Sequence, residues 1–339
     1  MVDTYRRYKS LGVTSSDTAP LGTTIASSML SFPYTYIHAD FSGDRGMTTG
    51  KLVEAVSSLS RAQGVAHLNL SDNPIVVGRE TTDGEYDATD LEFVEDTTGM
   101  LALSQSLQAS PTISELALSN CGIGPASLAL LFPVFAAVAL RWLDVSKNKI
   151  GVDGATALVS VLSRSNVRTL VFGPKATRLH LQVADVAALA PQPEPEGSAT
   201  AAPCVNAAFV GQELGPAELI VIAWWLSTEA TAGLEVVDMS GNPLTGGTAE
   251  CFGEGEYAPY TVGEDVAGVT AFATALQTSK ISSLVISNCG LGPKHISIVA
   301  SILATAGVGT VDLSNNHFDP SLLDGIKHKV KLDVTGCRA

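Results

Sequence analysis

One long block of this sequence is present twice. Residues 73–148 return as residues 242–316 with the same landmarks in the same order. Residues 120–125 read Asn-Cys-Gly-Ile-Gly-Pro and residues 288–293 read Asn-Cys-Gly-Leu-Gly-Pro, which is one conservative difference. Two copies of one block strongly constrain the fold and argue against a single catalytic pocket.

A shorter unit recurs inside each copy and, more weakly, along nearly the whole chain. Its first apolar residue serves as a marker, and successive markers are mostly 27 to 30 residues apart. The ten markers are Ala39, Leu68, Leu116, Leu143, Leu170, Ala207, Val237, Leu284, Val311 and Leu332. This period is typical of solenoids, in which each unit buries its apolar face on its neighbours. Three longer spacings place insertions at residues 76–98, 176–203 and 245–267.

The pattern of each unit predicts a strand, a turn and a helix. Leu143 and Val145 are two residues apart and therefore lie on one face of a short strand, whereas Trp142 and Asp144 point the other way. After the asparagine turn, residues 150–162 have apolar positions at helical spacing. Parallel strands lie about 4.8 Å apart but helices need roughly 10 Å, so the helices must fan outward. We expect an α/β horseshoe with a parallel sheet on its concave face.

The residues of the best unit also resemble a known family. Residues 143–151, Leu-Asp-Val-Ser-Lys-Asn-Lys-Ile-Gly, followed by Gly154, Ala155 and Leu158, are similar to a leucine-rich repeat of the ribonuclease-inhibitor type, which Ran GTPase-activating proteins also use. The resemblance covers about residues 36 to 337. It implies a leucine-rich-repeat solenoid of about ten strand-helix units, with the repeat domain at residues 36–339. Fold alone implies function only loosely.

Composition restricts the partners that we expect. The chain has 34 Asp and Glu against 20 Lys and Arg, a net charge of −14 that repels nucleic acid and anionic membranes. No apolar run reaches the roughly 20 residues of a membrane span, and residues 219–226 are expected to form a buried helix. A protein partner with a basic surface is the natural complement. We expect no enzyme activity, no cofactor, no bound metal and no small-molecule substrate, because no catalytic set of side chains is indicated.

The start of the chain and the cysteines indicate an intracellular location. Residues 1–20 lack the apolar core of a secretory signal. A mitochondrial presequence is the less favoured alternative, because acidic residues interrupt the basic cluster. Cys121, Cys289 and Cys337 occupy the asparagine-turn position of their units, where they would satisfy backbone groups. Five cysteines are an odd number for a disulfide scaffold, which favours a reducing compartment, so we expect a cytoplasmic or cytoskeletal protein.

Three regions are candidates for partner contacts. Residues 1–35 form an arm that is interpreted as a cap on the solenoid near Phe32 and as a partner-binding tail at Tyr5, Arg6 and Arg7. The first and third insertions carry matching acidic motifs, Glu85 and Tyr86 in one and Glu256 and Tyr257 in the other. Both insertions follow an Asn-Pro turn, so we expect them on the same edge. They are either inherited solvated decoration or a pair of contacts for a basic partner.

The strand face supplies the third candidate region. Carboxylates alternate along it with small apolar residues, and Asp144, Asp238 and Asp312 are the candidates for partner binding. Trp142, beside Asp144 and Arg141, is the best single contact residue if it is exposed; the alternative is that it packs under a loop. We expect Asp144→Ala to leave stability almost unchanged, whereas Leu118→Ala and Leu313→Ala should each cost about 2 to 5 kcal/mol.

Histidines in the first two units were considered as metal ligands. His38 and His67 fall in one column of the strand face, with Asp40 nearby. Because zinc sites usually need three or four ligands, surface histidines are the favoured interpretation.

The leading functional hypothesis is a non-enzymatic protein-interaction scaffold, a subunit of a larger intracellular assembly such as a cytoskeletal or ciliary one. The alternative, by analogy with Ran GTPase-activating proteins, is a GTPase-activating or regulatory protein, although no catalytic contact can be carried over. An inhibitor that clamps a basic enzyme, as ribonuclease inhibitor does, is a third possibility. Against it, the chain lacks that family's abundant cysteines and tryptophan-rich contacts.

Overall fold

The computed structural model describes residues 37–43, 65–73, 75–76, 78–81, 92–110, 112–181, 205–252 and 256–338. Its repeat strands are β1 (Ile37–Asp40), β2 (Val65–Asn69), β5 (Glu115–Ala117), β6 (Trp142–Asp144), β7 (Thr169–Phe172), β9 (Val205–Ala208), β10 (Leu234–Asp238), β13 (Ser283–Val285), β14 (Thr310–Asp312) and β15 (Lys331–Asp333). The remaining strands are β3 (Gly78–Thr81), β4 (Glu92–Glu95), β8 (Thr177–His180), β11 (Ala249–Phe252) and β12 (Glu256–Tyr260).

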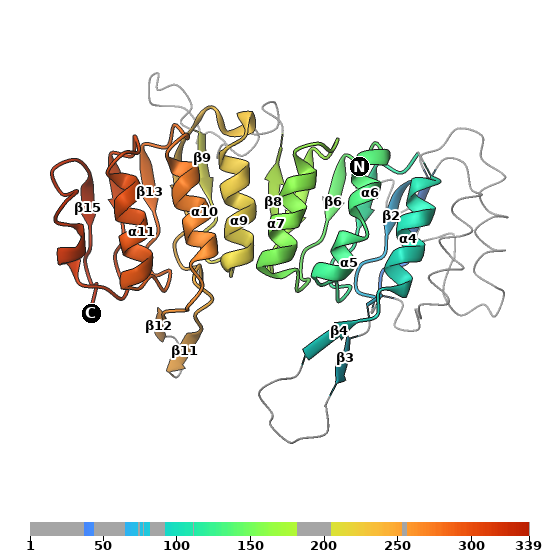
Figure 1. Cartoon of the computed structure of the whole chain (residues 1–339), viewed down its shortest axis with the longest axis horizontal. Helices are drawn as coiled ribbons and strands as arrows, with labels where there is room; N and C mark the ends of the chain where they lie inside the picture. The colour runs from blue at the N-terminus through green and yellow to red at the C-terminus, as the bar shows by residue number, and fades with distance from the viewer. Residues whose placement is uncertain are drawn as a thin grey trace, which may run out of the picture.

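Helices cover one face of the strands (Figure 1). They are α4 (Thr98–Gln108), α5 (Pro125–Ala129), α6 (Phe132–Ala137), α7 (Gly151–Leu162), α9 (Pro216–Leu226), α10 (Ala267–Leu276) and α11 (Pro293–Leu303), with 3-10 helices η3 (Glu229–Thr231) and η4 (Pro320–Leu323). A Gly-Pro pair starts α5, α9 and α11, because proline at the first helical position loses no hydrogen bond and presets the helical φ. The expected order of strand, turn and helix is confirmed in these units.

The repeat alignment also predicts the strand register. The ten marker residues lie in the ten repeat strands, and neighbouring markers are direct partners across each parallel pair. In the second half, for example, Val237 pairs with Leu284 and Leu284 with Val311. Because a slip of one residue would turn every side chain to the other face, this shared register places all the apolar markers on the helix side.

The expected single parallel sheet is wrong, because the strands form two sheets. One has the order β1-β2-β5-β6-β7-β8 and the other β15-β14-β13-β10-β9. After β7 the chain turns back through Gly173 and Ala176, both at positive φ, and β8 pairs with β7 in antiparallel orientation. A hairpin therefore follows directly on β7, and the second insertion begins with a strand that adds to the sheet.

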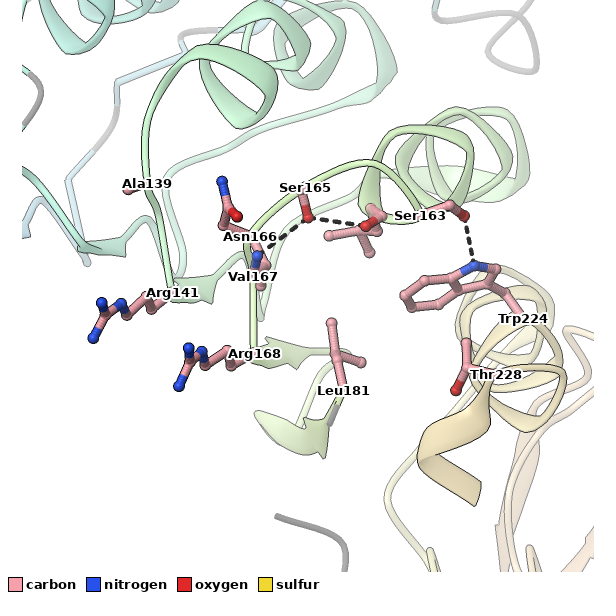
Figure 2. Close-up of a pocket in the computed structure, with 11 residues that line it drawn as sticks. Ala139, Arg141, Ser163, Ser165, Asn166, Val167, Arg168, Leu181, Trp224 and Thr228 are labelled. Carbon is pink, nitrogen blue, oxygen red and sulfur yellow. Dashed lines mark hydrogen bonds between the residues drawn. The ribbon is translucent and has the colours of Figure 1, made fainter. Parts of the chain in front are cut away.

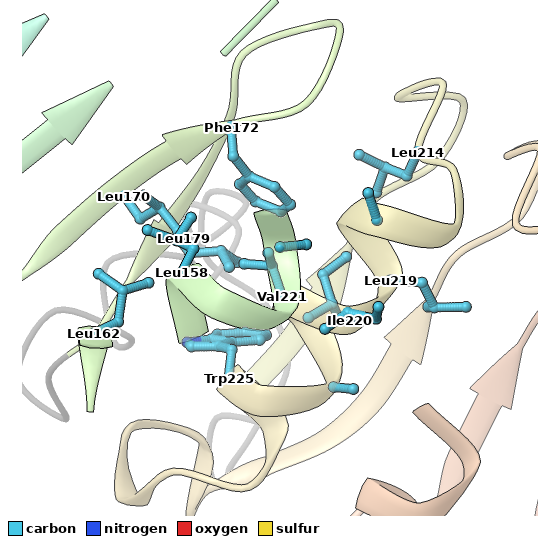
Figure 3. Close-up of a cluster of buried hydrophobic side chains, with 14 of the residues drawn as sticks. Leu158, Leu162, Leu170, Phe172, Leu179, Leu214, Leu219, Ile220, Val221 and Trp225 are labelled. Atoms are coloured by element: carbon cyan, nitrogen blue, oxygen red, sulfur yellow. The ribbon is translucent and has the colours of Figure 1, made fainter. Parts of the chain in front are cut away.

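The hydrophobic core continues across this break between the sheets. Figure 3 shows Leu158 of α7, Leu170 and Phe172 of β7 and Val221 and Trp225 of α9 in one cluster. Nearly all of α9 is buried, as expected for residues 219–226. Trp225 donates a hydrogen bond from Nε1 to the carbonyl of His180, at 2.8 Å, which ties the second half of the chain to β8. The two sheets therefore share one core.

Asparagine or cysteine side chains close the turn after most of the repeat strands. Asn316 donates from Nδ2 to the carbonyls of Leu313 and Ile286 and accepts from the amides of Cys289 and Leu291, at 2.8 to 3.0 Å. These bonds join each turn to the turn of the preceding unit. They satisfy backbone groups that the short strands leave unpaired.

The structural role predicted for the cysteines is confirmed. Cys121 and Cys289 each donate from Sγ to a carbonyl of the preceding unit, Leu70 at 3.1 Å and Met239 at 3.3 Å. Burial raises the pKa of both thiols to about 12. Cys337 makes the equivalent contact with Leu313 at 3.2 Å. All three are free thiols rather than disulfides.

Candidate functional site

Trp142 lies in a polar and aromatic cluster on the strand face. The register places His67, Glu115 and Trp142 in one row across β2, β5 and β6. His67 donates from Nδ1 to Glu115 Oε2 at 2.8 Å, and its ring centroid lies 6.1 Å from that of Trp142 with 30° between the planes. Trp142 is half-buried by these neighbours. The indole is therefore packed against its neighbours on the strand face, and His67 and Glu115 join it as contact candidates.

The predicted carboxylates of the strand face have a local structural role. Asp144 Oδ1 accepts from the amide and the hydroxyl of Ser146, at 2.9 and 2.6 Å. Asp238 makes the same two bonds with Ser240, and Asp312 accepts from the amide of Ser314. An aspartate that bonds the backbone two residues on forms an Asx turn, which starts the bend after the strand. These two hydrogen bonds argue against the expectation that Asp144→Ala leaves stability unchanged.

Arg141, Trp142 and Asp144 have different surroundings in the structure. Arg141 is exposed and lines a pocket with Arg168, while Trp142 packs on His67 and Asp144 bonds Ser146. The residue spacing predicted the strand that carries these three residues. It did not predict the side chains that they contact, because some of those belong to neighbouring units.

Two β-hairpins form within the first and third insertions and extend from the same edge of the molecule (Figure 1). In the first, β3 pairs with β4, and Gly78 lies opposite Glu95. In the second, β11 pairs with β12, so that Cys251 lies opposite Tyr257 and Phe252 opposite Glu256. Both pairs are antiparallel. The predicted contact residues Glu256 and Tyr257 thus lie on the returning strand of the second hairpin.

The base of the first hairpin is attached through Glu95. Its carboxylate accepts from the amides of Gly124, Ala126 and Ser127 at the start of α5, at 3.3, 3.1 and 2.8 Å. A Cβ added at Gly124 would clash with this carboxylate, so the glycine makes the contact possible. Glu95 lies within the first insertion and yet is bonded to the repeats. The negative charge satisfies amides at a helix N-terminus.

The base of the second hairpin is attached by different side chains. Thr245 donates to the carbonyl of Gly290 at 2.9 Å, and His317 Nε2 contacts the carbonyl of Tyr260 at 2.7 Å. His295 is buried; its Nδ1 accepts from Gly292 and its Nε2 donates to the carbonyl of Asp265, at 3.2 and 3.1 Å. Burial lowers the pKa of His295 below its ordinary value. The hairpins are alike in position but not in attachment.

Several predicted residues lie outside the described residues. These are Tyr5, Arg6, Arg7, Glu85 and Tyr86. Among the residues that the structure describes, no three His, Cys, Asp or Glu side chains gather as a metal site. Within the same residues, no helix combines the length and apolarity that a membrane crossing needs.

Comparisons with known proteins agree with the repeat architecture. Residues 140–159 match one family described as Leucine Rich repeat, and residues 233–254 match a second, described as Leucine Rich Repeat. No curated protein matches the chain.

Three solved structures show remote likeness. One is described as leiomodin-1 actin-binding site 2, with 16% identity over 48% of this chain and 80% of that one, and a TM-score of 0.33. A Bacteroides fragilis protein has 9% identity over 86% of this chain and 61% of its own, with a TM-score of 0.25. An internalin of Listeria monocytogenes has 12% identity over 93% of this chain and 94% of its own, with a TM-score of 0.24. The two family matches cover one repeat in each half of the chain, and together with the register of the repeat strands they support a leucine-rich-repeat architecture.

Proposed function

We propose that this protein is a non-enzymatic scaffold that binds a protein partner, as a subunit of a larger intracellular assembly such as a cytoskeletal or ciliary one. The observation that carries the proposal is the pair of hairpins on one edge (Figure 1). Leucine-rich repeats generally mediate protein-protein interaction, which supports the same class of function. In this proposal the ten units act as one horseshoe, and both the two hairpins and the strand face contact the partner.

The attachment of the hairpins supports their use as contacts. Hydrogen bonds to the repeats hold both bases, through Glu95 in the first hairpin and through Thr245 and His317 in the second. A surface that is held in place before binding loses less conformational entropy on association. Two such points separated by several repeats would fix both the position and the direction of a partner.

The strand face offers a second contact region in the same proposal. Trp142 is half-buried beside the His67 and Glu115 pair, so part of the indole remains available. Tryptophan residues that are already packed on one side are typical of energetically dominant interface positions. The net charge of −14 favours a partner with a basic surface.

Affinity capture from native cells tests this proposal. The bait is the full chain, compared with Trp142→Ala, with Tyr86→Ser combined with Tyr257→Ser, and with a tail variant in which Arg6 and Arg7 become Ser. We expect a specific partner with the wild type and its loss with the hairpin variant or Trp142→Ala, while circular dichroism shows the folded state of each bait. Recovery of the wild-type chain only as a free monomer would refute the scaffold. Faster GTP hydrolysis by a small GTPase would instead favour the regulatory alternative.

A further inference from the structure

A pocket lies at the break between the two sheets, on the side where the strands begin. Its volume is about 390 Å³. Arg141, Val167 and Arg168 contribute from the segments that lead into β6 and β7, and Leu181 follows β8. Trp224, near the end of α9, forms the opposite side (Figure 2). β8 is the last strand of the first sheet, whereas α7 and α9 stay in contact across the break.

The charge of this pocket is opposite to that of the whole protein. Among the described residues that line it, the charged ones are Arg141 and Arg168, and none is Asp or Glu. The amide of Arg168 donates to the carbonyl of Arg141 at 2.7 Å, so the two residues are neighbours in adjacent units. Figure 2 shows their side chains extending to the same side. In the described part of the chain, no ion pair includes either guanidinium.

The other side of the pocket is aromatic and apolar. The indole of Trp224 donates from Nε1 to Ser163 Oγ at 2.9 Å, which fixes the orientation of the ring. Leu162 and Val167 are buried below it, and Leu181 is half-buried. Figure 2 shows the arginine heads and the indole on opposite sides of Leu181. A ligand that uses both sides must therefore carry acidic groups and an apolar group at some distance from each other.

We propose that this pocket binds an acidic segment of a partner protein, with carboxylates on Arg141 and Arg168 and an apolar side chain beside Trp224. The inference rests on the proposed scaffold function for the class of partner. Guanidinium groups bind carboxylates through two parallel hydrogen bonds, and arginine and tryptophan dominate interface energies. A lone small anion would contact only the arginine side, which is why a peptide is the better fit.

A labelled peptide measures this binding directly. The probe is a fluorescein-labelled Glu-Glu-Leu-Glu-Glu peptide, and the control peptide has Gln in place of each Glu. We expect the full chain to bind the acidic probe, and Arg141→Gln with Arg168→Gln to weaken it at least about tenfold, because two charge-assisted contacts are lost. Trp224→Phe should also weaken it, since the ring loses its bond to Ser163.

The matched control is Arg164→Gln. Arg164 is exposed in the same connection between α7 and β7 but does not line the pocket, so its loss removes one charge without touching the site. Unchanged binding by the double variant would overturn the proposal, as would an equal loss in Arg164→Gln. Tighter binding of an oligonucleotide of equal charge would overturn the peptide assignment. If the double variant loses peptide binding but still captures the partner fully, the scaffold function proposed for the hairpins is unaffected. The two proposals can therefore fail separately.

Discussion

The carboxylate of Glu95 accepts a hydrogen bond from the amide of Ser127 at 2.8 Å, and this contact joins the first hairpin to the start of α5. The equivalent residue in the second copy, Glu264, pairs instead with Lys294 at 3.1 Å on the exposed surface. The same sequence position therefore has a structural role in one copy and a solvent-exposed one in the other.

Replacing Glu95 by Ala should lower the free energy of unfolding by about 1 to 2 kcal/mol, because three backbone amides lose their acceptor at a helix N-terminus. Proteolysis of residues 78–95 should also become faster. Denaturant unfolding and limited proteolysis measure the two effects. Glu264→Ala is the matched control and should stay within about 0.5 kcal/mol of wild type. Equal losses for the two variants would contradict the difference in attachment.

Removing the buried asparagine of a turn should be far more destabilising than removing a cysteine. Asn316→Ala leaves two amides and two carbonyls without their partner, so we expect a loss of about 3 to 5 kcal/mol. Cys289→Ala removes only a weak thiol donor and a small apolar volume, and should cost about 1 to 2 kcal/mol. Urea unfolding measures both. A larger loss for Cys289→Ala would show that the thiol, and not the amide, holds the turns together.

Asp144→Ala should cost about 1 to 2 kcal/mol, since both hydrogen bonds from Ser146 are lost. Asp144→Asn keeps an acceptor at Oδ1 and should cost clearly less. Leu118→Ala, a fully buried position, should still cost about 2 to 5 kcal/mol. Thermal unfolding of the three variants measures this order. Asn and Ala variants of equal stability would refute the turn role of Asp144.

The buried thiols should be inert in the folded protein. With a pKa of about 12, Cys121 and Cys289 are almost entirely protonated at pH 8, and thiolate is the form that reacts. We expect iodoacetamide to label half-buried Cys337 before either of them. Peptide mass spectrometry measures each site, and labelling in denaturant provides the control in which the three react alike. Labelling of native Cys289 at the rate of Cys337 would contradict its burial.

The free energy of unfolding should decrease as the pH is lowered, because His295 becomes protonated. Its pKa is lowered by burial, so the neutral form is favoured in the folded state and Nδ1 can accept from Gly292. The unfolded state then binds more protons, and the contribution is present above an unfolded pKa of about 6.5 and is lost as pH falls below it. Nearby Glu264, Asp265 and Lys294 also act on this group. In urea unfolding between pH 7 and pH 5, the free energy of unfolding should decline less for His295→Asn than for wild type. Parallel pH profiles would exclude His295 as the source.

Most of the fold could be predicted because the repeat is local. A strand of a few residues, an asparagine or cysteine turn and a helix each depend on residues close in sequence, and the repeat period then determines the register. Val237, Leu284 and Val311 are partners for this reason. The break at β8 was missed, since it depends on the two positive-φ residues Gly173 and Ala176, and the repeat pattern is weakest there.

The site was predictable only in part. The edge that carries both hairpins followed from the equivalent insertion points, and Trp142 was correctly placed on the strand face. The pairing of His67 with Glu115 joins residues 48 positions apart in the sequence. The pocket is lined by Arg141, which leads into a strand of the first sheet, and by Trp224, whose helix follows a strand of the second. Such contacts depend on which units become neighbours and where the sheet stops.

The sequence by itself therefore determined the repeat, the strand register and the role of the turn residues, because each unit repeats a short local pattern that can only stack on itself. Only the tertiary structure decided that Glu95 supports a helix while Glu264 does not, and that the sheet divides at β8. It also brought Arg141, Arg168 and Trp224 around one pocket. These features arise where the repeat is interrupted, and there the packing of distant segments, rather than local periodicity, sets the geometry.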